Sequence, residues 1–310
     1  MNAYEPIRFS PPSRSSSGRT TEGRFGNAPR RKYVLYLPLA PKYARSPLLV
    51  LLHGCQQTAE TFAAGTRMNQ AAEDAGVAVL YPQQSLSANA LRCWNWFSRP
   101  ELDPRGDAAE IAALTRQVIQ ENSIDATRVY VAGMSAGGAM AVALARTYPD
   151  LYAAMGVHSG VPAGLAHDVA SAMRLMSSGP VRKKKAAASC GDEPSAVVAS
   201  IVFHGDEDEV VHPSNGEAIH ASATGTSISR PERRSRTATT RPSAGQRGFT
   251  RSVDFGLGGK TRRELWIVHG GGHAWAGGNE QQQHTDASGP DASREMLRFF
   301  LQHRLLTTSC

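Results

Sequence analysis

The pentapeptide Gly-Met-Ser-Ala-Gly at 133–137 places a serine between two different patterns of residues. The apolar run 129–132 is typical of a buried strand, and the alanine-rich segment up to about Tyr148 is typical of a helix. A Gly-x-Ser-x-Gly sequence between strand and helix predicts a nucleophile elbow, a sharp turn that raises the serine oxygen above the sheet. The helix N-terminus then faces the negative charge that develops when this oxygen attacks a carbonyl. Ser135 is therefore the predicted nucleophile of an acyl transfer.

A serine hydroxyl needs a general base, which is expected later in the chain and just after a strand. Of the ten histidines, only His273 follows both an apolar run, 264–268, and a flexible glycine approach, 270–272. His269 has the right chain order but precedes the glycines, so we predict packing at the strand end. His53 is expected to order its loop, and His158 and His204, near strand ends, are expected to make structural hydrogen bonds. Solvated side chains are predicted for the remaining histidines, which are His167, His212, His220, His284 and His303.

The carboxylate that orients the base is expected after the strand-like run 197–203. Asp206, Glu207 and Asp208 compete there within three positions. The pattern His-Gly-x-x-Asp-x-x-Val turns its last aspartate toward the histidine loop, which favours Asp208 and leaves Asp206 as the runner-up.

Two backbone N–H groups must hold the negative oxygen that forms during attack. Ala136, the residue after the nucleophile, is expected to supply one of them. The other should come from the loop 53–57 behind the apolar run 47–52, with Cys55 favoured over Gln56. The Cys55 thiol is not a predicted nucleophile, because it lacks the elbow context.

These residues need a sheet whose strands all end at one edge, and the chain predicts such a sheet. Short apolar runs alternate with helical patterns from Lys32 onward, which indicates βαβ units and an α/β fold with a mostly parallel central sheet and helices on both faces. The expected strands are 32–37, 47–52, 77–81, 129–132, 197–203 and 264–268. The expected helices are 61–75, 107–121, opened by a capping box of Asp107 and Glu110, and 136–148.

Length and composition agree with a globular chain. The 310 residues, 41% of them hydrophobic, allow one or two domains, but predicted site residues spread from Cys55 to His273 require one continuous sheet. We expect a disordered basic tail at 1–31, rich in Ser, Pro and Gly, and a single catalytic domain at 32–306 with polar insertions near 177–196 and 221–248. The net charge of +7 lies mainly in these segments, so it does not indicate a nucleic-acid or membrane partner.

Other features exclude further classes of function. No apolar run approaches the roughly 20 residues needed to cross a bilayer. The four cysteines show no paired Cys-x-x-Cys motif, so no structural zinc site is expected. The N-terminus lacks the hydrophobic segment of a secretory signal, which predicts a cytoplasmic location. The sequence leaves the oligomeric state open.

Several motifs in one order resemble the polyhydroxybutyrate (PHB) depolymerase family of esterases, over about Phe25 to His303. The motifs are Leu51-Leu52-His53-Gly54-Cys55, Ala64-Gly65-Thr66-Arg67-Met68-Asn69, Cys93-Trp94-Asn95-Trp96-Phe97, the elbow with Gly138, Val157-His158-Ser159-Gly160, the stretch from His204 to Asp208, His212-Pro213-Ser214-Asn215-Gly216 and Gly272-His273-Ala274-Trp275.

This resemblance implies a single α/β-hydrolase domain, a Ser135-Asp208-His273 triad, no metal or organic cofactor and a possible Cys55–Cys93 disulfide. Many family members are extracellular, against the cytoplasmic expectation. The implied substrates are poly- or oligo(3-hydroxyalkanoates) or short soluble esters, and the lack of an appended polymer-binding module favours soluble ones. A feruloyl or acetyl-xylan esterase, a serine peptidase or an inactive binding protein of this fold are the alternatives. Trp94, Trp96 and Trp275 are candidates for an apolar substrate pocket, with core packing as the alternative.

Overall fold

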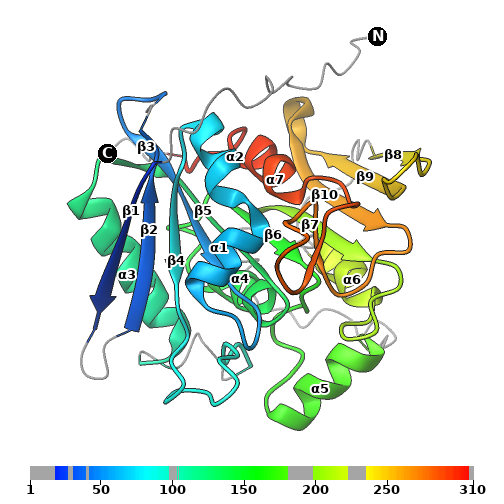
Figure 1. Ribbon diagram of the computed structural model, residues 1–310, viewed down its shortest axis with the longest axis horizontal. Helices are drawn as coiled ribbons and strands as arrows, with labels where there is room; N and C mark the ends of the chain where they lie inside the picture. Colours follow the sequence, from blue (N-terminus) through cyan, green and yellow to red (C-terminus); the bar gives the residue numbers. More distant parts are fainter. Residues whose placement is uncertain are drawn as a thin grey trace.

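The computed structural model describes residues 18–26, 31–39, 42–97, 103, 105–180, 198–222 and 235–306. Ten strands form one sheet in the order β1-β2-β4-β3-β5-β6-β7-β10-β9-β8 (Figure 1). These strands are β1 Arg19–Phe25, β2 Arg31–Leu37, β3 Ser46–Leu52, β4 Ala78–Pro82, β5 Ile124–Met134, β6 Ala154–His158, β7 Ala199–Gly205, β8 Ser235–Thr240, β9 Phe249–Phe255 and β10 Thr261–Val268. The short strands β11 Trp275–Ala276 and β12 Thr285–Asp286 pair with each other.

The central strands run parallel from β4 to β10, and the outer pairs at both edges are antiparallel. Parallel strands are buried on both faces, which explains the continuous apolar run of β3, where residues 48–52 have no exposed surface. The predicted α/β fold with a mostly parallel sheet is confirmed.

Helices cover both faces of the sheet (Figure 1). They are α1 Ala59–Thr66, α2 Met68–Ala75, α3 Asp107–Glu121, α4 Ala136–Thr147, α5 Val169–Ser178, α6 Ser214–Ser222 and α7 Ala292–Phe300, with a short 3-10 helix at Leu257–Gly259. Helices α1, α2 and α7 close one hydrophobic cluster, and α3, α4 and α5 close the other. No helix in the described residues is long and apolar enough to cross a membrane.

Two predicted helical features differ from the structure. The helix expected over 61–75 is two helices, because Arg67 takes a left-handed conformation with φ 53° between α1 and α2. Asp107 does not cap α3: the N-cap is Gly106, and the Asp107 carboxylate accepts a hydrogen bond from Arg31 at 2.7 Å. An ion pair within the protein therefore takes the place of the predicted capping box.

Two segments predicted to lack regular structure contain strands. Within the expected tail, Arg19–Phe25 forms β1 along β2, and within the expected insertion 221–248, Ser235–Thr240 forms β8 along β9. Both are edge strands with mostly exposed side chains, so neither shows the apolar alternation from which strands are predicted. The remaining tail residues 1–17 and 27–30 and the stretches 181–197 and 223–234, which hold the basic runs 182–185 and 233–234, lie outside the described residues.

Candidate active site

The candidate nucleophile stands in a strained turn between β5 and α4. Ser135 has φ 55° and ψ −121°, its backbone N–H donates to the carbonyl of His158 at 2.9 Å, and its side chain makes no cap hydrogen bond to α4. A side chain on Gly137 would collide with the carbonyl oxygen of Leu52, so the turn requires a glycine there. The elbow expected from the sequence thus has the backbone geometry that raises the serine oxygen at the N-terminus of a helix.

The candidate acid and base meet across two loops. His273 Nδ1 lies 2.8 Å from Oδ2 and 3.1 Å from Oδ1 of Asp208. An ionised carboxylate can only accept, so Nδ1 carries a proton, and in the neutral form of this ring Nε2 has the lone pair. Burial alone would raise the pKa of Asp208, but the N–H groups of His204 and His273 outweigh it and hold that pKa well below its ordinary value. The pair is therefore an ionised carboxylate hydrogen-bonded to the Nδ1–H of an imidazole.

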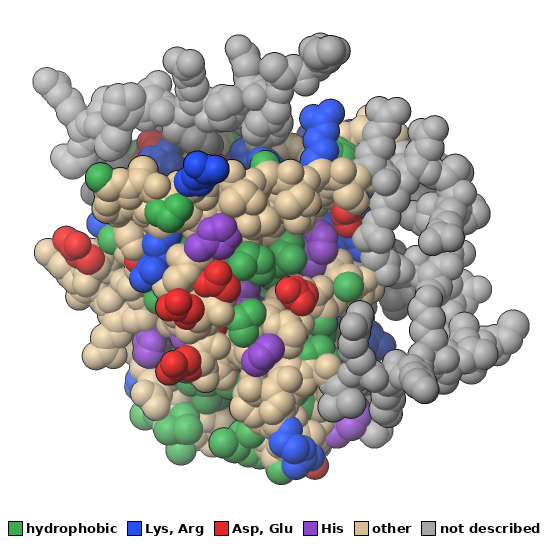
Figure 2. All heavy atoms as spheres, turned by 90° about the vertical axis from the view of Figure 1, so that its right-hand side faces the viewer, with side chains coloured by type: hydrophobic (Ala, Val, Ile, Leu, Met, Phe, Trp, Pro, Cys, Tyr) green, Lys and Arg blue, Asp and Glu red, His purple; other side chains and the backbone are tan. Residues whose placement is uncertain are grey.

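The runner-up acid has a different position. Asp206, Glu207 and Glu209 are exposed, whereas Asp208 is only 4% exposed. Asp206 Oδ1 accepts a hydrogen bond from the Gly270 N–H at 2.6 Å, so this carboxylate supports the glycine turn before His273. Figure 2 shows acidic side chains close to histidines on one face of the molecule.

The two loops are held together by backbone contacts. The Glu207 N–H donates to the Gly271 carbonyl at 3.0 Å, and the Asp206 N–H donates to the Val268 carbonyl at 3.1 Å. A side chain on Gly205 would collide with the carbonyl of Gly271. The glycines therefore allow the close approach that brings Asp208 to His273.

His158, at the end of β6, connects the elbow to the histidine loop. Its carbonyl accepts from Ser135, and its Nε2 accepts from the Ala276 N–H at 3.0 Å. The ring stacks on Phe203 and Trp275, with centroids 5.9 and 5.2 Å away. We predicted only a structural hydrogen-bonding role for His158, and the sequence does not show that it would join these two loops.

The proposed oxyanion loop follows β3. The Gln56 N–H donates to the Leu91 carbonyl at 2.7 Å, so it is not free to bind a substrate oxygen. The Cys55 N–H has no hydrogen-bond acceptor among the described residues. Ala136 is the first residue of α4, where a helix has unpaired N–H groups. The structure contains a Cys55–Cys93 disulfide, which ties this loop to the segment after β4.

A buried polar network contacts the candidate oxyanion loop from the protein interior. The Trp94 indole N–H donates to the His53 carbonyl at 3.0 Å, and the Gln84 N–H donates to His53 Nε2 at 3.1 Å. Gln84 also donates to Asp107 at 2.6 Å, and Asp107 pairs with Arg31. The Arg31 guanidinium lies 5.2 Å from the Trp94 ring centroid. Residues far apart in the sequence thus fix the loop that carries Cys55.

The three candidate tryptophans are buried. Trp94 and Trp275 have no exposed surface, and Trp96 is 6% exposed. The Trp275 indole N–H donates to the hydroxyl of Ser293 at 3.1 Å. Of the two roles considered for them, Trp94 and Trp275 take core packing, because a fully buried ring offers no surface to a substrate.

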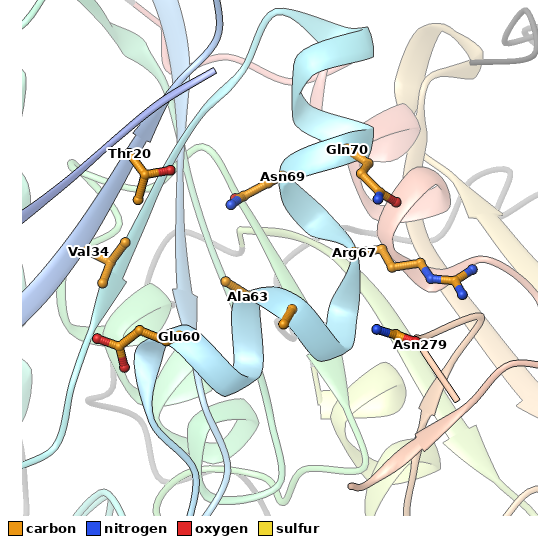
Figure 3. A pocket seen from close by; sticks show the side chains of 9 residues that line it. Thr20, Val34, Glu60, Ala63, Arg67, Asn69, Gln70 and Asn279 are labelled. Carbon is orange, nitrogen blue, oxygen red and sulfur yellow. The ribbon is translucent and has the colours of Figure 1, made fainter. Parts of the chain in front are cut away.

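No group of three or more His, Cys, Asp or Glu side chains in the described ranges is arranged to hold a metal ion. A hollow of about 520 Å³ lies beside the break between α1 and α2 (Figure 3). Its lining residues are Thr20, Val34, Glu60, Ala63, Ala64, Arg67, Asn69, Gln70 and Asn279. None of the candidate site residues lines this hollow, so it is separate from the candidate active site.

Three histidines should make stability depend on pH. Burial lowers the pKa from 6.5 to about 4 for His53 and His303 and to about 3 for His158. Between about pH 6.5 and 4 the unfolded chain therefore binds more protons than the folded one. We expect the free energy of unfolding to decrease as the pH is lowered through this window, by on the order of 1 kcal/mol per pH unit for each histidine.

Urea unfolding at pH 7, 6 and 5 measures this slope. The Asp208 carboxyl contributes only near and below its ordinary value of 3.8, outside the window. In a matched variant, His303→Gln, one titrating group is removed, and the slope should fall by between about a quarter and a third, since burial also lowers the pKa of His284. Equal unfolding free energies at pH 7 and pH 5 would contradict the prediction.

The sheet order and the strand–serine–helix turn give the chain the α/β-hydrolase fold. The family model described as Esterase PHB depolymerase matches residues 31–225, which is more than half of the chain. The chain therefore belongs to the esterase PHB depolymerase family, as the sequence motifs indicated.

Relatives with several activities resemble the chain. It is 32% identical to Poly(3-hydroxyalkanoate) depolymerase C of Paucimonas lemoignei over 221 residues, 68% of this chain and 52% of that protein. It is 34% identical to Probable acetylxylan esterase A of Aspergillus fumigatus over 162 residues, 49% and 43% of the two chains. It is 32% identical to Feruloyl esterase B of Thermothelomyces thermophilus over 183 residues, 55% and 62%. The chain spans about half the length of the curated relatives it matches.

Among solved structures, an acetyl xylan esterase from Aspergillus awamori matches with a TM-score of 0.64 and 20% identity. The match covers 92% of this chain and all of that chain. At this level of identity the likeness shows the fold alone.

Proposed function

We propose that this protein is a serine esterase that hydrolyses carboxylic esters through an acyl-enzyme intermediate. The observation that carries the proposal is the 2.8 Å hydrogen bond between Asp208 and His273, on loops tied through His158 to the strained Ser135 turn. Serine, histidine and an ionised aspartate in this chain order form the arrangement that activates a hydroxyl for attack on a carbonyl.

In the first step, His273 Nε2 takes the proton of Ser135 as Oγ attacks the ester carbonyl. Asp208 holds the ring in the tautomer with Nδ1 protonated and stabilises the imidazolium that forms. His273 then passes the proton to the departing alcohol, which leaves an acyl group on Ser135. In the second step, His273 activates a water that releases the acid.

Cys55 and Ala136 supply the two N–H donors for the negative oxygen in this mechanism. Gln56 is unsuited, because its N–H already donates to Leu91. A pair of fixed donors stabilises the developing charge without reorganisation during the reaction. The disulfide at Cys55 and the buried network below His53 limit the movement of this loop.

For the substrate, we propose oligomeric 3-hydroxyalkanoates or short soluble esters. The similarity to Poly(3-hydroxyalkanoate) depolymerase C supports this class. Acetylated or feruloylated carbohydrate is the alternative, supported by the similarity to acetylxylan and feruloyl esterases. A serine peptidase would use the same groups, and the complete Asp208–His273 pair argues against an inactive binding protein.

A comparison of hydrolysis rates on a panel of esters and peptides separates these substrate classes. Defined 3-hydroxybutyrate dimers and trimers, alkyl p-nitrophenyl esters, acetylated xylo-oligosaccharides, methyl ferulate and peptides should be compared by kcat/KM at one pH. We expect hydrolysis of hydroxybutyrate oligomers with kcat/KM at least about tenfold above the carbohydrate-type esters, a margin of about 1.4 kcal/mol in transition-state binding. The reverse order would favour the carbohydrate esterase, and cleavage of peptides alone would favour a peptidase.

A further inference from the structure

His204 is a fully buried imidazole at the end of β7 that the mechanism above does not use. Its Nε2 lies 2.7 Å from the Val211 carbonyl oxygen and 3.4 Å from Oδ2 of Asp208. Both neighbours are acceptors, so Nε2 carries the proton of this ring. The N–H of His204 therefore donates to the Val211 carbonyl and also lies beside the edge of the carboxylate that faces the protein interior.

The two oxygens of Asp208 have different surroundings. Oδ1 accepts from the backbone N–H groups of Val210 at 3.0 Å and Val211 at 2.8 Å. Oδ2 accepts a hydrogen bond from His273 at 2.8 Å, and its next polar neighbour is His204 Nε2, 3.4 Å away. The oxygen with the shorter contact to the catalytic imidazole is therefore the one next to His204.

The His204 ring is held in this orientation at a cost. Its Nδ1 has no hydrogen-bond partner among the described residues, although it is buried. Helix α6 closes this side, since a side chain on Gly216 would come within 2.6 Å of Nδ1. A buried acceptor without a partner is unfavourable, so the benefit of the ring must come from its other nitrogen.

We propose that His204 is a positioning residue for the candidate acid: its Nε2–H holds the carbonyl of Val211, whose own N–H binds Oδ1 of Asp208, and it lies against Oδ2. The ring thereby fixes the carboxylate against His273 and keeps it charged. This inference rests on the proposed function, in which Asp208 orients His273. The arrangement places the aspartate between two imidazoles, of which only His273 reacts with the substrate.

Loss of the His204 N–H has a predictable direction. Without it, the charge on Oδ2 is less stabilised and the carboxylate holds the Nδ1 proton of His273 more strongly. Protonated His273 is then favoured, and a higher pH is needed to obtain the neutral base. The acid limb of the pH profile of kcat/KM should therefore move to higher pH.

The other titratable groups around Asp208 and position 204 are the same in all variants. They are His158 on β6, His273 after β10, the exposed Asp206, Glu207 and Glu209 on the same loop, and, on α6, the exposed Glu217 and the half-buried His220, which lies 3.4 Å from Asp254. A displacement of the acid limb between variants then reports the change at position 204.

Two matched substitutions test the proposal in the full chain. In His204→Gln the amide nitrogen can occupy the position of Nε2, whereas in His204→Asn it can reach only the position of Nδ1. We expect His204→Gln to keep kcat within about fivefold and the acid limb in place. We expect His204→Asn to lose about 10- to 100-fold in kcat, with KM within about twofold and an acid limb about half a pH unit higher.

The profiles should be measured from pH 5 to 9 with a p-nitrophenyl ester, with circular dichroism to verify folding. Equal profiles for folded Gln and Asn variants would overturn the inference, because a space-filling role does not distinguish them. If the Asn variant does not fold, His204→Leu, which fills the space without an N–H, takes its place: a limb at higher pH beside an unmoved Gln limb supports the inference, and equal limbs overturn it. Absence of turnover in the wild type on every ester would instead refute the proposed function.

Discussion

Replacing Ser135 by alanine should abolish ester hydrolysis and leave the fold intact. The substitution removes only Oγ, and the N–H of residue 135 can still donate to the His158 carbonyl. Without the nucleophile, kcat for a short p-nitrophenyl ester should fall by on the order of 10⁶-fold, the loss typical when a serine of this kind is removed. Initial rates at high enzyme concentration measure the loss, and the thermal unfolding midpoint reports the fold.

Ser200 provides a matched control for this experiment. It is a fully buried serine on β7, and its hydroxyl has no hydrogen-bond partner in the described part of the chain. Ser200→Ala should therefore keep the wild-type rate. Turnover that survives in purified Ser135→Ala protein would remove Ser135 from the mechanism and require another nucleophile.

Local sequence signals were sufficient for the strands that carry the candidate site. The apolar runs that predicted β3, β5, β7 and β10 are buried on both faces of the sheet, and parallel strands direct their following loops to one edge. A serine, an aspartate and a histidine placed directly after such runs are therefore expected to converge. The contact between Asp208 and His273, 65 residues apart, follows this logic.

Long-range polar contacts could not be predicted in the same way. Arg31 lies at the border of the expected tail, yet it pairs with Asp107, 76 residues later. Nothing in the sequence near Arg31 indicates that partner. The sequence places His158 and His204 at strand ends, but the partners of their ring nitrogens lie on loops whose positions the sequence does not show. Edge strands β1 and β8 gave no signal, because their exposed side chains lack apolar alternation.

The choice between Asp206 and Asp208 depends on the turn after β7, which determines the direction of each side chain. Asp208 points inward and is enclosed by N–H donors, whereas Asp206 points to the glycine turn. Asp208→Asn should lower kcat by about 10⁴-fold, because the amide N–H₂ cannot accept a hydrogen bond from Nδ1–H and favours the wrong tautomer of His273. The acyl-transfer rate on a p-nitrophenyl ester measures this loss.

Asp206→Asn is the matched comparison, two residues away on the same loop. The asparagine keeps a carbonyl oxygen that can accept from the Gly270 N–H, so the support of the histidine loop is retained. We expect kcat within about threefold of the wild type, since a surface hydrogen bond is exchanged for a similar one. A large loss in Asp206→Asn with full activity in Asp208→Asn would reassign the acid. Comparable large losses in both would mean that the support of the glycine turn by Asp206 needs a charge, because a neutral acceptor would then not suffice to hold His273 in place.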